Sequence, residues 1–162
     1  TPVYSRELFG KIVDQFSGGA GGEAELCVVD FEGKPVAGAL LVHDDYRKLT
    51  QVPSASSLRD FNHTSANMWM YFKLLMRSIE RGSKRFDFGR SSEGSGTYKF
   101  KEQWGAKPQP TVWQYHVPPR STADIGAMRP DNPKNQRRIA IWQKLPVWLT
   151  RAVGPCIVRG IP

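Results

Sequence analysis

Hydrophobic positions recur every three or four residues in two segments of the chain. Between Ser5 and Phe16 this spacing predicts an amphipathic helix that Gly18-Gly19 ends, with apolar side chains at Leu8, Phe9, Ile12, Val13 and Phe16. It returns after Thr64 or Ser65, either of which can cap a longer helix that stops at Gly82. The predicted apolar face of that second helix consists of Met68, Tyr71, Phe72, Leu75, Met76 and Ile79.

The segment between the two helices has an extended pattern. Glu23 to Phe31 and Val36 to His43 are predicted strands, and the turn Glu32 to Pro35 between them indicates an antiparallel hairpin. A third strand is expected between Tyr46 and Val52. The polar stretch from Pro53 to His63 is predicted to be a loop.

Shorter elements follow the second helix. We predict an alternating strand from Arg85 to Gly89, a Gly/Ser loop from Arg90 to Gly96 and a short helix from Thr97 to Trp104. Pro110 to Val117, which is rich in Val, Trp and Tyr, is predicted to be a last strand. The order α-β-β-β-α-β-α-β indicates an α+β domain, with a mixed, mostly antiparallel sheet flanked by helices.

The character of the sequence changes after His116. Several prolines indicate an irregular linker, and a basic, Trp-containing helix is expected from Asn135 to Arg151 with a break at Pro146. We therefore place one domain at residues 1–117 and a basic, Pro-rich extension with a C-terminal helix at residues 118–162.

The net charge of the 162-residue chain is +8, and it is unevenly distributed. Residues 118–162 contain eight Lys/Arg and two Asp, which leaves +6 on the extension and +2 on the first 117 residues. Such a tail attracts phosphate on nucleic acid, anionic lipid or a nucleotide-linked substrate, or it is a solubilising surface without a specific partner. No apolar run is long enough to predict a membrane span. Because the chain starts at Thr1, we expect it to be a piece of a longer protein.

The densest cluster of polar and glycine residues runs from Arg85 to Gly105. A strand that ends in Gly-Arg-Ser and leads through a Gly-rich loop into a helix brings backbone N–H groups, two cations and a hydroxyl to one mouth of the sheet. Spacing alone leaves two interpretations open, an anion site and a tight turn.

The same cluster carries a family resemblance. The run FDFGRSSEGSGTYKFKEQWGAKPQP, with ANMWMYFKLLMRSIERG before it and WQKLPVWLTRAVGPCIVRGIP far downstream, resembles the FemAB-related proteins, especially the branch associated with PEP-CTERM and exosortase exopolysaccharide systems. The resemblance covers nearly the whole chain. It implies a GNAT-like fold, here the second of two lobes with the N-terminal lobe missing. It also implies transfer of an acyl or aminoacyl group to an amine of a peptidoglycan- or exopolysaccharide-related acceptor.

The resemblance also bears on the donor. Relatives with known activity take amino acids from aminoacyl-tRNA, so we expect no bound cofactor and an acyl donor that is either aminoacyl-tRNA or an acyl thioester. GNAT enzymes place a Gly-containing pyrophosphate loop before the long helix, whereas residues 53–67 contain no glycine and the Gly-rich loop, residues 89–96, lies one strand later. Acetyl-CoA bound in the usual way is therefore not expected. A bacterial cytoplasmic location is expected, with tRNA or the inner face of the membrane as possible contacts of the basic tail.

Acyl transfer to an amine needs a cation or N–H group facing the developing oxyanion and a route for the departing proton. Lys101, which follows Phe100 as in the family's Phe-Lys pair, is the first candidate for the oxyanion or a phosphate; a solvated helix lysine is the alternative. Asp87 is the second catalytic candidate, and a hydrogen-bonded structural acid is the alternative there.

The predicted substrate-binding residues surround these two. Arg90 is expected to clamp a phosphate with its planar guanidinium, unless it forms an ion pair that ties the strand to the loop. Ser91, Tyr98 and Lys99 complete the set in the loop and the short helix. Asn67, at the start of the long helix, is the last candidate: it could face the same cleft or could simply cap the helix.

The sequence leaves the role of His63 and a second function open. His63 could relay a proton beside Asn67 or could simply cap the helix, and no spacing suits a metal or a Ser-His-Asp triad. The alternative function is a non-catalytic GNAT-like binding module that docks on tRNA, nucleotide-sugar or anionic membrane.

Overall fold

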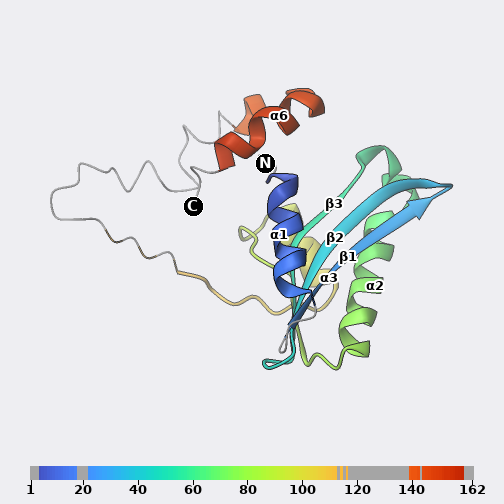
Figure 1. Cartoon of the computed structure of the whole chain (residues 1–162), viewed down its shortest axis with the longest axis vertical. Helices are drawn as coiled ribbons and strands as arrows, with labels where there is room; N and C mark the ends of the chain where they lie inside the picture. Colours follow the sequence, from blue (N-terminus) through green and yellow to red (C-terminus); the bar gives the residue numbers. More distant parts are fainter. Residues whose placement is uncertain are drawn as a thin grey trace. The chain divides into compact units, whose positions relative to one another are not determined.

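The computed structural model describes residues 4–17, 22–112, 114, 116, 139–142 and 144–158. Residues 10–107 form one compact unit, and residues 1–9 with 108–162 form another. The elements, shown in Figure 1, are α1 (Arg6–Phe16), β1 (Gly22–Phe31), β2 (Lys34–Asp44), β3 (Leu49–Ser57), the 3-10 helix η1 (Arg59–Thr64), α2 (Ala66–Glu80), β4 (Arg85–Asp87), α3 (Gly96–Gln103) and α6 (Val147–Val158).

The four strands form one mixed sheet in the order β1-β2-β3-β4, which confirms the predicted fold class. β1, β2 and β3 pair antiparallel, whereas β4 runs parallel to β3 after the crossover through α2. Glu32 and Gly33 join β1 to β2 with φ angles of 52° and 76°. Positive φ at both central residues matches the twist of a two-residue hairpin, so this turn sets the register of β1 on β2.

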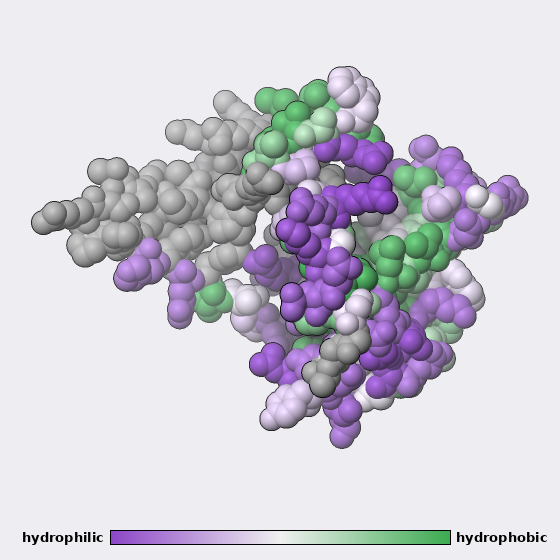
Figure 2. Space-filling model, in the orientation of Figure 1, coloured by the Kyte–Doolittle hydropathy of each residue, from purple (hydrophilic) through white to green (hydrophobic). Residues whose placement is uncertain are grey.

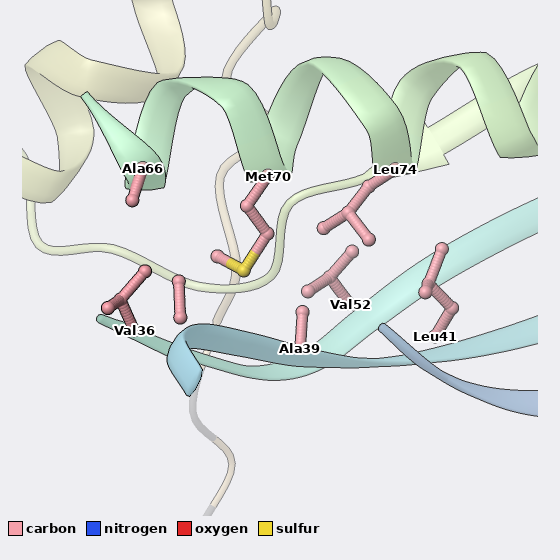
Figure 3. Packing of buried hydrophobic residues seen from close by; sticks show 8 residues of the cluster. Val36, Ala39, Leu41, Val52, Ala66, Met70 and Leu74 are labelled. Carbon is pink, nitrogen blue, oxygen red and sulfur yellow. The ribbon is translucent and has the colours of Figure 1, made fainter. Parts of the chain in front are cut away.

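The core lies between α2 and the sheet. Ala66, Met70 and Leu74 are spaced four residues apart and therefore occupy one face of α2. Figure 3 shows these side chains pointing at the strands, where they meet Val36, Ala37, Ala39 and Leu41 of β2 and Val52 of β3. Met70 is 0% exposed and Leu74 1% exposed, so this contact defines how the helix sits on the sheet.

The third strand differs from its prediction. It runs from Leu49 to Ser57, so the loop predicted from Pro53 onward is wrong over the strand's second half. Leu40 pairs with Ser54 and Val42 with Gln51, which leaves Val52 and Pro53 opposite a single β2 residue. This arrangement is a β-bulge, where a proline without an N–H is tolerated inside a strand.

The helix ends are mostly as predicted. Gly82, with φ 73°, follows the C-terminus of α2 and donates its N–H to the Ile79 carbonyl. At the N-terminus Ser65 takes a left-handed conformation and makes no side-chain cap, whereas Thr64 Oγ1 accepts the Ala66 N–H at 3.3 Å. Thr64 is therefore the capping side chain of the two proposed.

Two predictions concern the segment after α3. The strand expected from Pro110 to Val117 is wrong for residues 110–112, 114 and 116, which are not strand. Pro110 lacks the N–H that a ladder needs at its position. Residues 139–142 are helical, Pro146 separates them from α6, and α6 extends to Val158. The domain boundary predicted near residue 118 lies outside the described residues. Within the described part of the chain, no helix is long and apolar enough to cross a membrane.

A chain of polar side chains crosses the sheet from β2 through β3 to the segment before β4. His43 and Thr50, 1% and 0% exposed, face each other across β2 and β3. Thr50 Oγ1 lies 2.8 Å from His43 Nδ1 and 2.8 Å from Ser83 Oγ. The other ring nitrogen, Nε2, lies 3.7 Å from Glu25 Oε1, which is beyond hydrogen-bond distance.

Arginines from the end of α2 surround that carboxylate. Arg77 binds Glu25 through two nitrogens at 2.8 and 2.7 Å, and Arg81 approaches it at 3.3 Å while also pairing with Glu23. The Arg77 hydrogen bond lowers the pKa of Glu25. Burial lowers the pKa of His43 and outweighs the opposing effect of the Glu25 charge. The fold therefore favours a neutral imidazole.

We expect Met70→Ala to lower the free energy of unfolding by about 2–5 kcal/mol, because it opens a cavity in the core. Met76→Ala is the matched control on the same helix, since Met76 is 40% exposed, and it should cost under about 1 kcal/mol. Urea denaturation measures both. Equal losses would show that α2 does not pack through the Met70 face.

The lowered pKa of His43 makes the stability of the fold depend on pH. Because the folded pKa lies below the ordinary 6.5, the unfolded chain takes up a proton first as the pH falls. Unfolding free energy should therefore be highest above about pH 7 and decrease as the pH drops through and below 6.5. His43→Gln should flatten this slope, and replacement of the exposed His63 by Gln should leave it intact. The same slope in both variants would contradict the assignment.

Candidate active site

The site is built on the separation of β4 from β3. The two strands pair only at Leu49–Arg85, Thr50–Phe86 and Gln51–Asp87. β3 continues to Ser57, and among the described residues no strand covers that side of it beyond Gln51. The bulge at Val52 and Pro53 begins at the same point. The structure therefore has an open strand edge whose backbone groups can pair with an extended molecule.

The first residues of the loop after β4 lie beside β3 where the pairing ends. Asp87 Oδ1 accepts the Gly89 N–H at 2.7 Å, and Oδ2 accepts a hydrogen bond from Gln51 Nε2 at 3.4 Å. Gly89 has φ 74°, and a side chain added there would lie 3.6 Å from the Val52 carbonyl oxygen. A glycine suits this position because of its left-handed conformation.

Lys101 of α3 fixes the other side of the loop. Its Nζ donates to the carbonyl oxygens of Gly89 at 2.7 Å and Arg90 at 3.0 Å. Desolvation lowers the pKa of Lys101, and the Asp87 carboxylate acts in the opposite direction. An ammonium has three N–H donors, so one remains beyond the two bonds to the loop.

An aromatic cluster joins the elements that carry the loop. Tyr71 of α2 stacks on Phe88 with ring centroids 5.8 Å apart and meets Phe100 of α3 edge-on at 4.9 Å. Phe86 contacts Phe88 at 4.7 Å, and Phe100 contacts Trp104 at 6.4 Å. Such contacts add to burial and orient β4 and α3 against the first half of α2.

The structure brings most of the predicted residues to this region. Asp87, Lys101 and the Arg90 backbone meet around Gly89. Ser91 Oγ is buried without a hydrogen-bond partner among the described residues. Asn67 is half-buried one helical turn before Tyr71 and therefore shares its side of α2.

The backbone N–H groups of Tyr98 and Lys99 are bound by Ser95, which caps the N-terminus of α3. The backbone N–H of Tyr98 donates to the Ser95 side chain, and that of Lys99 donates to the Ser95 carbonyl. The exposed His63 bonds the Asp60 carbonyl within η1, a local contact. The functional roles of all these residues stay predictions. In the described ranges, no group of three His, Cys, Asp or Glu side chains is placed to hold a metal ion.

Sequence reasoning missed several features of the site. The carbonyl oxygens of Gly89 and Arg90 that bind Lys101 belong to the backbone, so the residue types do not indicate their role. Gln51 reaches Asp87 only because β3 and β4 are neighbours, and the buried Trp104 Nε1, which has no partner in the described structure, lacks any sequence signal. The spacing of Tyr71, by contrast, was visible in the helix pattern.

The Asp87 contact can be tested by amide exchange. In Asp87→Ala the Gly89 N–H loses its carboxylate acceptor, so we expect its exchange to accelerate at least about tenfold, the scale of a charged hydrogen bond. Asp87→Asn keeps an acceptor oxygen and should change the rate far less. Unchanged Gly89 exchange in the alanine variant would show that other contacts hold the loop.

The chain is similar, in sequence or in fold, to proteins described as acetyltransferases. The family model described as "Acetyltransferase (GNAT) domain" matches residues 1–102. No curated protein matches the sequence. Among solved structures, "Putative acetyl transferase from Pyrococcus furiosus" is 17% identical with a TM-score of 0.55, covering 68% of this chain and 73% of that one. Ribosomal-protein-alanine N-acetyltransferase from Brucella melitensis biovar Abortus 2308 is 14% identical with a TM-score of 0.48, covering 58% and 71%. The family match covers more than half of the chain, which therefore belongs to the acetyltransferase (GNAT) domain family.

Proposed function

We propose that this chain is the catalytic lobe of an acyltransferase that hands an activated acyl or aminoacyl group to an amine on a cell-envelope acceptor. The observation that carries the proposal is the stretch of β3 from Val52 to Ser57 that β4 leaves unpaired, which begins beside Gly89 of the loop held by Asp87 and Lys101. An extended, amide-containing donor can pair with that edge and present its carbonyl to the loop.

The donor is an aminoacyl-tRNA or an acyl thioester. Residues 53–67 contain no glycine, and the described structure makes this segment the end of β3, η1 and the start of α2. The first N–H of α2 is bound by the Thr64 hydroxyl. These features favour a donor whose phosphates are not bound by a glycine loop at the start of α2.

Lys101 and Asp87 carry the chemistry in this proposal. The neutral acceptor amine attacks the donor carbonyl, a C–N bond forms, and the carbonyl oxygen becomes an oxyanion that the remaining Lys101 N–H stabilises. The bond to the tRNA oxygen or thiol sulfur then breaks, and the amine proton leaves through Asp87 or water. Arg90, Ser91, Tyr98, Lys99 and Asn67 would position the phosphate-bearing substrate.

The acceptor class rests on the resemblance to FemAB-related proteins of the PEP-CTERM branch. We propose a peptidoglycan- or exopolysaccharide-related amine, reached at the cytoplasmic face of the membrane. The partner lobe would be an N-terminal domain of the same protein. The basic tail would attract either tRNA or anionic lipid.

Incubating the full-length protein separately with charged tRNA, acyl-CoA and acyl-carrier protein tests the proposal. Mass spectrometry should show loss of the acyl group from one donor, with transfer to an amine when an envelope precursor is added. If none of the three donors loses its acyl group, the binding-module alternative is favoured.

We expect Lys101→Ala to lower kcat by about a hundredfold or more, the scale of losing one preorganised donor. Lys107→Ala is the matched control, because Lys107 is an exposed lysine shortly after the same helix and is not among the proposed site residues. Single-turnover assays of the full-length enzyme compare the two. A Lys101→Ala enzyme with normal turnover would mean that Lys101 only fixes the loop.

A further inference from the structure

α6 presents exposed apolar side chains on more than one side. Val147, Trp148, Val153 and Ile157 are 73%, 71%, 40% and 38% exposed. At about 100° per residue, Val153 and Ile157 share one side of the helix, and Val147 and Trp148 project from two others. Figure 2 shows the described part of this segment mostly in the green of hydrophobic residues. An apolar helix of this kind needs a cover.

The length of α6 limits what that cover can be. Its twelve residues span about 18 Å, against about 30 Å for the hydrocarbon core of a bilayer. A helix this short can lie within the headgroup and upper acyl region but not cross it. Thr150 Oγ1 donates to the Val147 carbonyl at 2.9 Å, so its hydroxyl is already satisfied in an apolar setting.

The charged residues that flank α6 in the sequence have one sign. Residues 132–162 contain no Asp or Glu, and their six cations are Lys134, Arg137, Arg138, Lys144, Arg151 and Arg159. Arg151 is the one charged residue of α6 itself, and a long arginine side chain can keep its guanidinium at the phosphate level while the stem is buried. Each Lys or Arg near an anionic leaflet contributes about 1 kcal/mol of attraction.

We propose that the segment 139–158 docks on the surface of an anionic phospholipid membrane, with α6 inserted at the interface and the surrounding cations on the lipid phosphates. Tryptophan is enriched at membrane–water interfaces, so Trp148 suits a helix that lies there. This inference deepens the proposed location at the membrane face, and because its test measures binding alone, failed docking and failed catalysis are distinguishable.

RNA fits these features less well. Nucleic acids bind cations and stacking aromatic rings, and they offer nothing to exposed Val and Ile side chains. A lipid interface uses both the apolar surface and the positive charge. RNA binding by the tail is therefore the alternative outcome of the test.

Co-sedimentation of the full-length protein with vesicles tests the proposal. Vesicles of phosphatidylcholine with roughly one quarter phosphatidylglycerol should bind the protein at least about tenfold better than pure phosphatidylcholine, and about 0.5 M NaCl should weaken that binding. Trp148→Glu should lower vesicle binding at least about tenfold, because it places a charge in the inserted surface. Trp148→Phe keeps the apolar ring and should bind nearly as wild type.

Trp69→Glu is the matched control. Trp69 is a 52% exposed tryptophan on α2, and its replacement should leave vesicle binding unchanged. Vesicle binding that is absent, or equal in wild type and Trp148→Glu, would overturn the proposal. So would binding lost in Trp69→Glu alone, or a tail that binds single-stranded RNA but not the anionic vesicles.

Discussion

The structure depends on one constraint, the short pairing of β4 with β3. A parallel strand after a helical crossover normally extends the sheet, but here the ladder stops after Gln51–Asp87. The bulge at Val52 and Pro53 alters the course of β3 at that point, and Gly89, in a left-handed conformation, lies beside the Val52 carbonyl. The result is a strand that belongs to the sheet on one side and is available to a ligand on the other.

The residues that hold this separation are also those proposed for the chemistry. Asp87 reaches both Gly89 and Gln51, and Lys101 bonds two loop carbonyls while it retains one donor. The Tyr71 cluster carries this assembly on α2, whose other contacts are the core of the domain. Stability of the fold and geometry of the site therefore share elements, as preorganised electrostatic sites require.

Much of this fold could be predicted from the sequence, because its signals are local. The existence of the long helix follows from apolar spacing, and the β1–β2 hairpin follows from its turn. The predicted apolar face is wrong at Met68, Phe72, Met76 and Ile79, because these residues are exposed and α2 packs on the sheet through Met70 and Leu74. The second half of β3 could not be predicted, since Pro53 signals a loop unless the bulge is known. The motif placed Asp87, Arg90 and Lys101 at one loop, but the carbonyl partners of Lys101 and the buried contact of His43 with Thr50 depend on long-range pairing that spacing does not encode.

Backbone amide exchange along β3 tests the central claim most directly. The full-length protein would be compared alone and saturated with a stable amide or thioether analogue of its acyl donor. The account predicts that alternate amides between Ser54 and Ser57 slow at least about tenfold as the donor pairs with the open edge, while those of β1 stay unchanged. Protection that appears elsewhere and leaves β3 unaffected would contradict it.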